Sequence, residues 1–226
     1  LSQINRLRRE IQDVQTRLEA ANALLREEGE VKKRLLAAQT NQALFEQLDQ
    51  DMERRITSLA HLIETLPEAE HPRNLTAYIT LCLCHIKRRM NLFFLARQGE
   101  SLPGDELGMY MDELAELGRY GGLRTLLRCG QIGALEIRSA ALCYDFAFEA
   151  MSWTLLEEAS PLMGYLEKEG SQLVFRFLPG GDPGRWQFSR ELMAAVSALG
   201  GEIVCKDLDD AYGICLTVPL GGESCG

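Results

Sequence analysis

The last third of the chain alternates strand-forming and helix-forming segments in an order that few folds accommodate. An apolar run from Leu173 to Phe177 is followed by a loop of glycine and proline, 178–184, and by a helical stretch from Arg190 to Leu199. A Gly200-Gly201 break then leads to two further apolar runs within 202–222. Short apolar runs bounded by turn residues predict strands, so this part of the chain is expected to form an α/β layer.

Composition restricts the classes of protein to which the chain can belong. With 226 residues, 46% of them apolar and 25% charged, it is long enough for one or two packed domains and is not disordered by composition. A net charge of −9 excludes a general nucleic-acid surface, which needs an excess of Lys and Arg. No run of about 18 uncharged apolar residues occurs, so no membrane span is predicted. The chain starts at Leu1 inside a helical pattern, which favours a piece of a longer protein.

The cysteines indicate the redox environment. There are seven, an odd number, and most lie in apolar runs. This favours reduced thiols in the core of a cytoplasmic protein over a disulfide framework. Cys82 and Cys84 precede His85, but the spacing lacks the second pair of ligands that a zinc site needs, so no metal is predicted.

Residues 1–40 carry a seven-residue apolar repeat. Ile4, Ile11, Leu18 and Leu25 share one position of the repeat, and the other faces are mainly Arg, Glu, Gln and Asn. The repeat predicts a parallel dimeric coiled coil. Two interpretations are open: an ordinary dimerising coiled coil, or a signalling helix that passes a change of helix packing from an upstream sensor into the next domain.

Residues 41–100 predict two long helices joined by a short loop. The first can continue from the coiled coil until the stretch from Leu66 to Asn74, where Pro67 and Pro72 break it. The second is expected from Leu75 to about Arg97, with apolar residues at three- and four-residue intervals: Ile79, Leu83, Ile86, Met90, Phe93 and Phe94. Two such hairpins would associate as a dimeric four-helix bundle.

Residues 101–226 are expected to form an α/β sandwich. A helix or two is predicted within 102–128, a strand at 134–137 and a strong helix from Ser139 to Met151. The Gly200-Gly201 break after a helix, and a final strand that ends at Pro219, resemble the end of the ATP-binding domain of sensor histidine kinases, the GHKL ATPase fold. With the helical hairpin, the layout resembles a histidine-kinase cytoplasmic core, and the fold class implied is α+β.

In that family a helix called the N-box carries a Glu, an Asn four residues later that holds Mg²⁺, and then a basic residue. Glu149 matches the Glu, but Trp153 stands at the Asn position and Glu157 at the basic one. A Trp offers no oxygen to Mg²⁺, and a Glu repels a triphosphate. Leu178 replaces the Asp that reads adenine. Trp153 and Trp186 are candidates to fill the space of a nucleotide.

The resemblance also implies candidate nucleotide-binding glycines, namely Gly180, Gly181, Gly184, Gly200 and Gly201. The alternative is that they are turn glycines. The loop between Gly184 and Ser189 is too short to fold over a triphosphate, and Ser189 is predicted to cap the helix that follows.

Phosphotransfer in this family needs a histidine on the first helix of the hairpin, and none matches. Asp49 stands near that place, His61 is followed by leucine, and His71 falls in the loop. His85, on the second helix, is the remaining catalytic candidate. Its alternative is a helix-surface or interface histidine, because no carboxylate lies within one helical turn of it in the sequence. The basic run 87–89 is a solvated face or a grip on an acidic partner or on phosphates.

Three functions are therefore open. The favoured hypothesis is a degenerate, kinase-like homodimer, a pseudokinase that signals by conformational relay or by binding a response regulator or another signalling protein. The alternative is an active sensor histidine kinase that uses ATP and Mg²⁺ to phosphorylate a response regulator, as the cytoplasmic part of a membrane sensor. The third is an unrelated coiled-coil interaction protein with an α/β domain.

Overall fold

The computed structural model describes residues 28–30, 32, 53–68, 71–157, 161–180, 186–208 and 211–220. The chain divides into two units, Leu1–Thr57 and Ser58–Gly226. In the first unit the described residues, 28–30, 32 and 53–57, are helical. The heptad positions Ile4, Ile11, Leu18 and Leu25 and the phosphoacceptor position at Asp49 lie outside the described residues, so the coiled coil stays a prediction.

The second unit is a mixed α/β structure, as predicted. After a helical stretch at 58–65 its elements are η1 (Leu66–Glu68), α2 (Pro72–Gln98), β1 (Ser101–Pro103), α3 (Gly104–Tyr120), β2 (Thr125–Cys129), β3 (Ala134–Glu136), α4 (Ile137–Leu156), β4 (Leu162–Glu169), β5 (Gln172–Pro179), α5 (Arg190–Ala198), β6 (Glu202–Leu208) and β7 (Ala211–Pro219). None of the described helices combines the length and the apolar character of a membrane span.

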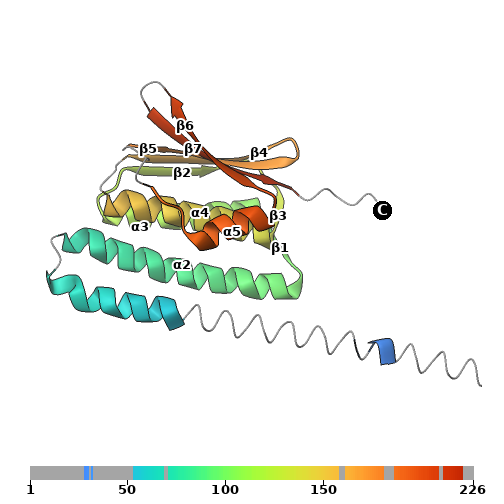
Figure 1. Ribbon diagram of the computed structural model, residues 1–226, viewed down its shortest axis with the longest axis horizontal. Coiled ribbons are helices and arrows are strands. Elements are labelled where there is room, and N and C mark those ends of the chain that lie inside the picture. The colour runs from blue at the N-terminus through green and yellow to red at the C-terminus, as the bar shows by residue number, and fades with distance from the viewer. Residues whose placement is uncertain are drawn as a thin grey trace, which may run out of the picture. The chain divides into compact units, whose positions relative to one another are not determined.

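A five-stranded sheet forms one layer of this unit, in the order β2-β4-β5-β7-β6. Only β2 pairs in parallel, with β4; the other pairs are antiparallel, and β1 and β3 form a separate two-stranded ribbon. The helices α2 to α5 all lie on one side of the sheet (Figure 1). Because successive side chains of a strand point to opposite faces, Leu173, Phe175 and Phe177 of β5 lie on the side of the helices, where they are buried.

α4 is the central helix of the core. Thirteen of its residues are buried, including Phe146 and Met151, because the sheet, α2 and α3 surround it. A helix that is apolar on most of its circumference is stable only in such a place. Because α4 is surrounded in this way, its few polar side chains lie close to residues of neighbouring helices and strands.

α2 confirms the predicted second helix of the hairpin. Its first turn carries Pro72, whose fixed φ suits that position, and Gly99 ends it in the left-handed conformation. Ala77, Leu81 and Leu92 bury one face of α2 in the same core as α3 and α4. The proposed domain boundaries at residues 40 and 100, and the dimeric bundle, stay predictions.

Candidate functional site

One stripe of α4 carries the polar and aromatic side chains that the N-box comparison singled out. Asp145, Glu149 and Trp153 are spaced by four residues, so they lie above one another on one face of the helix. Each contacts a different part of the second unit: α2, the start of α5, and the segment before α5. The stripe therefore joins elements that are far apart in the sequence.

Glu149 is held by Ser189, the residue before α5. One carboxylate oxygen accepts the backbone N–H of Ser189 at 3.0 Å, and the other accepts the Ser189 hydroxyl. Ser189 Oγ in turn accepts the N–H of Leu192 at 3.1 Å, which confirms the predicted N-cap. Burial raises the pKa of Glu149, and the Ser189 hydrogen bonds partly oppose that rise. Both oxygens of this carboxylate are thus engaged within the protein.

Trp153 stacks on Trp186, with ring centroids 5.5 Å apart and an interplanar angle of 12°. Trp186 is 8% exposed and contacts the rings of Phe146 and Phe188, at 6.2 and 4.7 Å between centroids. The indole Nε1 of Trp153 is buried and has no hydrogen-bond partner among the residues that the structure describes. This group is a donor only, so it cannot ligate a cation.

A complex of ATP with Mg²⁺ does not fit the residues present. Hard cations take oxygen ligands, and the position of the Mg²⁺-binding Asn presents the stacked indole of Trp153. Glu157, at the basic position, is exposed at the C-terminal end of α4. Leu178 stands at the position of the Asp that reads adenine. It lies beside Met163 on the face of the sheet that points away from the helices. Trp153 and Leu178 offer no oxygen to a metal ion, and none of the three positions supplies a cation to a phosphate.

The candidate glycines are placed as follows. Gly200 ends α5 with φ +65, and a Cβ on Gly201 would stand 2.7 Å from the carbonyl oxygen of Thr217 on β7. A turn and a close approach of two backbones therefore explain this pair without a ligand. Gly180 is exposed directly after β5, and Gly181 and Gly184 lie outside the described residues. Nucleotide binding by these glycines stays a prediction.

His85 is buried, so of the two alternatives to a catalytic role, a helix-surface or an interface histidine, the surface position is wrong. It is 3% exposed, and its Nε2 lies 2.8 Å from Oδ1 of Asp145. Its ring stacks on Phe148, with 3.9 Å between centroids. The sequence showed no carboxylate beside His85 because Asp145 is 60 residues away in the chain. The available signal was on α4, where Asp145 and Glu149 are two acids in an apolar helix.

Two residues of the basic run 87–89 contact other helices of the same unit. Arg88 binds Glu113 of α3 at 2.6 Å and lies over the ring of Tyr110, 4.2 Å from its centroid. Arg89 lies 3.3 Å from Asp145, while Lys87 is exposed. Two of the three cations are therefore used to join α2 to α3 and α4.

Comparison with known proteins gives a likeness of fold. No family model and no curated protein matches the sequence. Among solved structures, the histidine kinase domain of a blue-light activated histidine kinase from Erythrobacter litoralis matches with 12% identity and a TM-score of 0.46, over 76% of this chain and 93% of that domain.

A longer structure of the same kinase matches with 14% identity and a TM-score of 0.43, over 78% of this chain, which spans only 60% of that protein. The histidine kinase AdeS from Acinetobacter baumannii matches with 11% identity and a TM-score of 0.37, over 76% of this chain and 98% of that one. These matched structures are all of histidine kinases, the class that the sequence resembles, and degeneracy stays a prediction.

Proposed function

We propose that this protein is a signalling module with the layout of a histidine-kinase core, in which the nucleotide site has been replaced by aromatic packing. It acts as a homodimer that changes conformation or binds a response regulator, and it does not transfer phosphoryl groups. The observation that carries the proposal is the stack of Trp153 on Trp186, at the position that the family gives to its Mg²⁺ ligand.

Two further contacts support this function. In a kinase the Glu149 carboxylate would orient an attacking group. Here both of its oxygens accept hydrogen bonds from Ser189, and the carboxylate thereby fixes the start of α5. His85, which has the Asp145 carboxylate beside it, is 3% exposed, and a phosphoryl group could not reach it without local opening.

The homodimer is supported by the face of α2 that points away from the core. Leu83 and Phe94 are 52% and 45% exposed, and Ile86 and Met90 between them are partly buried. These four residues, spaced by three, four and four, form one stripe along the helix that we call the α2 stripe. The opposite face of α2 is already buried in the core, so the stripe is available to a second copy.

Calorimetric titration of the whole chain with ATP and Mg²⁺ tests the proposal. We expect no heat of binding at about millimolar ATP and no rise in melting temperature, since any ligand that prefers the folded state raises it. Binding at micromolar concentration would overturn the proposal and favour an active kinase. Radiolabelled phosphate, followed on wild type and on His85→Gln, would then identify the acceptor.

A variant of Trp153 tests whether the aromatic stack is what closes the site. Trp153→Asn restores the residue type of the family and removes the ring that lies on Trp186. We expect this variant to gain measurable affinity for ATP with Mg²⁺, whereas Trp153→Phe, which keeps an aromatic ring, gains none. If Trp153→Asn folds, as judged by circular dichroism, and still ignores nucleotide, the stack is not the reason for the missing affinity.

A further inference from the structure

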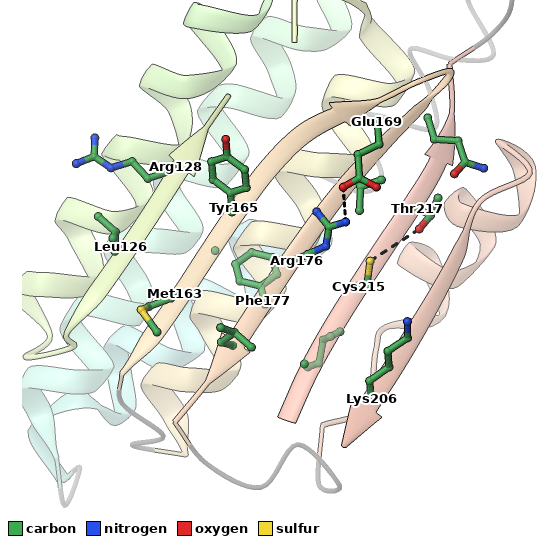
Figure 2. A pocket seen from close by; sticks show the side chains of 16 residues that line it. Leu126, Arg128, Met163, Tyr165, Glu169, Arg176, Phe177, Lys206, Cys215 and Thr217 are labelled. Carbon is green, nitrogen blue, oxygen red and sulfur yellow. Dashed lines mark hydrogen bonds and ion pairs between the residues drawn. The ribbon is translucent and has the colours of Figure 1, made fainter. Parts of the chain in front are cut away.

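The face of the five-stranded sheet that points away from the helices carries a hollow of about 670 Å³ (Figure 2). Its apolar floor includes Leu126, Met163, Tyr165 and Leu178, which are 46%, 47%, 45% and 37% exposed. Leu126 pairs with Met163, and Met163 with Leu178, so three of these side chains form a row across β2, β4 and β5. No helix among the described residues covers this face. Exposed apolar side chains gathered in this way indicate a binding surface.

The charges on this face fall into two kinds. Arg176, in the middle, binds Glu167 and Glu169, and Figure 2 shows it reaching toward Glu169. Arg128 and Lys206 are exposed and form no ion pair within the described part of the chain. Arg176 with its two carboxylates therefore carries one surplus negative charge, and the cations left for a partner are Arg128 and Lys206 at the edges of the hollow.

The distance between the two cations limits the size of that partner. Arg128 stands on β2 and Lys206 on β6, the two outermost strands of the sheet. Neighbouring strands lie about 4.8 Å apart, so four spacings separate these strands by about 19 Å. A helix rises about 1.5 Å per residue, and about 13 residues span that distance. A small anion would reach only one of the two cations.

We infer that this surface, which we call the open sheet face, docks an acidic amphipathic helix of a protein partner. The apolar side of such a helix covers the row of Leu126, Met163 and Leu178, and carboxylates near its two ends meet Arg128 and Lys206. A second copy of the chain, stacked through the same face, would place these cations opposite one another, which like-charge repulsion disfavours. The inference does not rest on the proposed function, because α4 and α5 lie on the other side of the sheet (Figure 1).

The test uses a fluorescein-labelled, stapled helix of about 14 residues with leucines on one face and glutamates in its first and last turns; the staple is needed because free helices of this length are marginal. Fluorescence anisotropy against the whole chain is expected to show saturable binding that weakens with salt. The double variant Arg128→Glu with Lys206→Glu should weaken it by about tenfold or more. Arg190→Glu, an exposed reversal on α5, should leave it unchanged.

A peptide with lysines in place of the glutamates makes the test specific. It should bind the double variant and not the wild type, a swap that mere damage to the fold would not produce. Absence of saturable binding by the acidic helix, or equal binding to wild type and double variant, overturns the inference. A wild-type dimer that Met163→Glu dissociates in light scattering would also overturn the inference, because a second copy would then occupy the face. Displacement of the helix by micromolar decanoate would overturn it too, because the hollow would then be a small-molecule site.

Discussion

At the scale of single residues, the buried pair of His85 and Asp145 joins α2 to α4. His85→Ala removes the hydrogen bond to Asp145, removes the ring that stacks on Phe148, and leaves a cavity. We expect a loss of about 2–4 kcal/mol in the free energy of unfolding, measured by urea denaturation. His61→Ala, an exposed histidine, is the matched control and should have little effect. Equal stability of the two variants would show that the pair does not hold the helices together.

Tyr110 makes a prediction about pH. Its hydroxyl donates to Glu106 at 2.6 Å, and burial, followed by that contact, raises the pKa of Tyr110 to about 12 from 10.0. The folded chain therefore holds this proton more tightly than the unfolded chain does. The resulting stability is complete below pH 10 and is lost as the pH rises from 10 towards 12. Urea denaturation across this window should show a steeper loss in wild type than in Tyr110→Phe, and identical slopes would contradict the assignment.

The residues that sequence could predict are those whose roles are local. Ser189 was predicted as a helix cap because a serine directly before a helical run suffices to indicate one. The partner of that cap, Glu149, is 40 residues earlier, and the partner of His85 is 60 residues later. Such pairs depend on how helices pack, which hydrophobic periodicity leaves open. The same limit explains why the burial of His85 was not foreseen.

At the scale of elements, the start of α5 depends on a single side chain. Ser189→Ala removes the acceptor for the Leu192 N–H and one donor to Glu149. We expect a loss of about 1–2 kcal/mol, against little change for Ser197→Ala in the exposed part of the same helix. The lost hydrogen bond also raises the pKa of Glu149 further, so the deficit of Ser189→Ala should grow as the pH rises above 4.5. A deficit that is constant with pH would separate Glu149 from the cap.

Strands were predicted where a short apolar run stands between turn residues. β5 was recognised from its apolar run, and the hairpin of β6 and β7 from the glycines around it. β4 was missed, because Met163 and Tyr165 face outward yet are apolar, so the alternation with the buried Leu162 and Leu166 is masked. The side chains that obscured β4 in the sequence are those that form the floor of the open sheet face.

At the scale of the whole molecule, the α2 stripe makes the last prediction. A helix with one face in the core and Leu83 and Phe94 exposed on another is expected to pair with a second copy, because exposed apolar stripes of this length rarely stay uncovered. Wild type should therefore have the mass of a dimer in light scattering at micromolar concentration. The double variant Leu83→Glu with Phe94→Glu should have the mass of a monomer and keep its circular dichroism spectrum.

Met109→Glu is the matched control for that measurement, since Met109 is 61% exposed on α3 and lies outside the α2 stripe. It should leave the dimer intact. A wild-type monomer would contradict the dimer outright. A dimer that survives both variants would move the interface away from α2, most directly to residues 1–40, where the heptad repeat predicts a coiled coil that needs no contribution from the second unit.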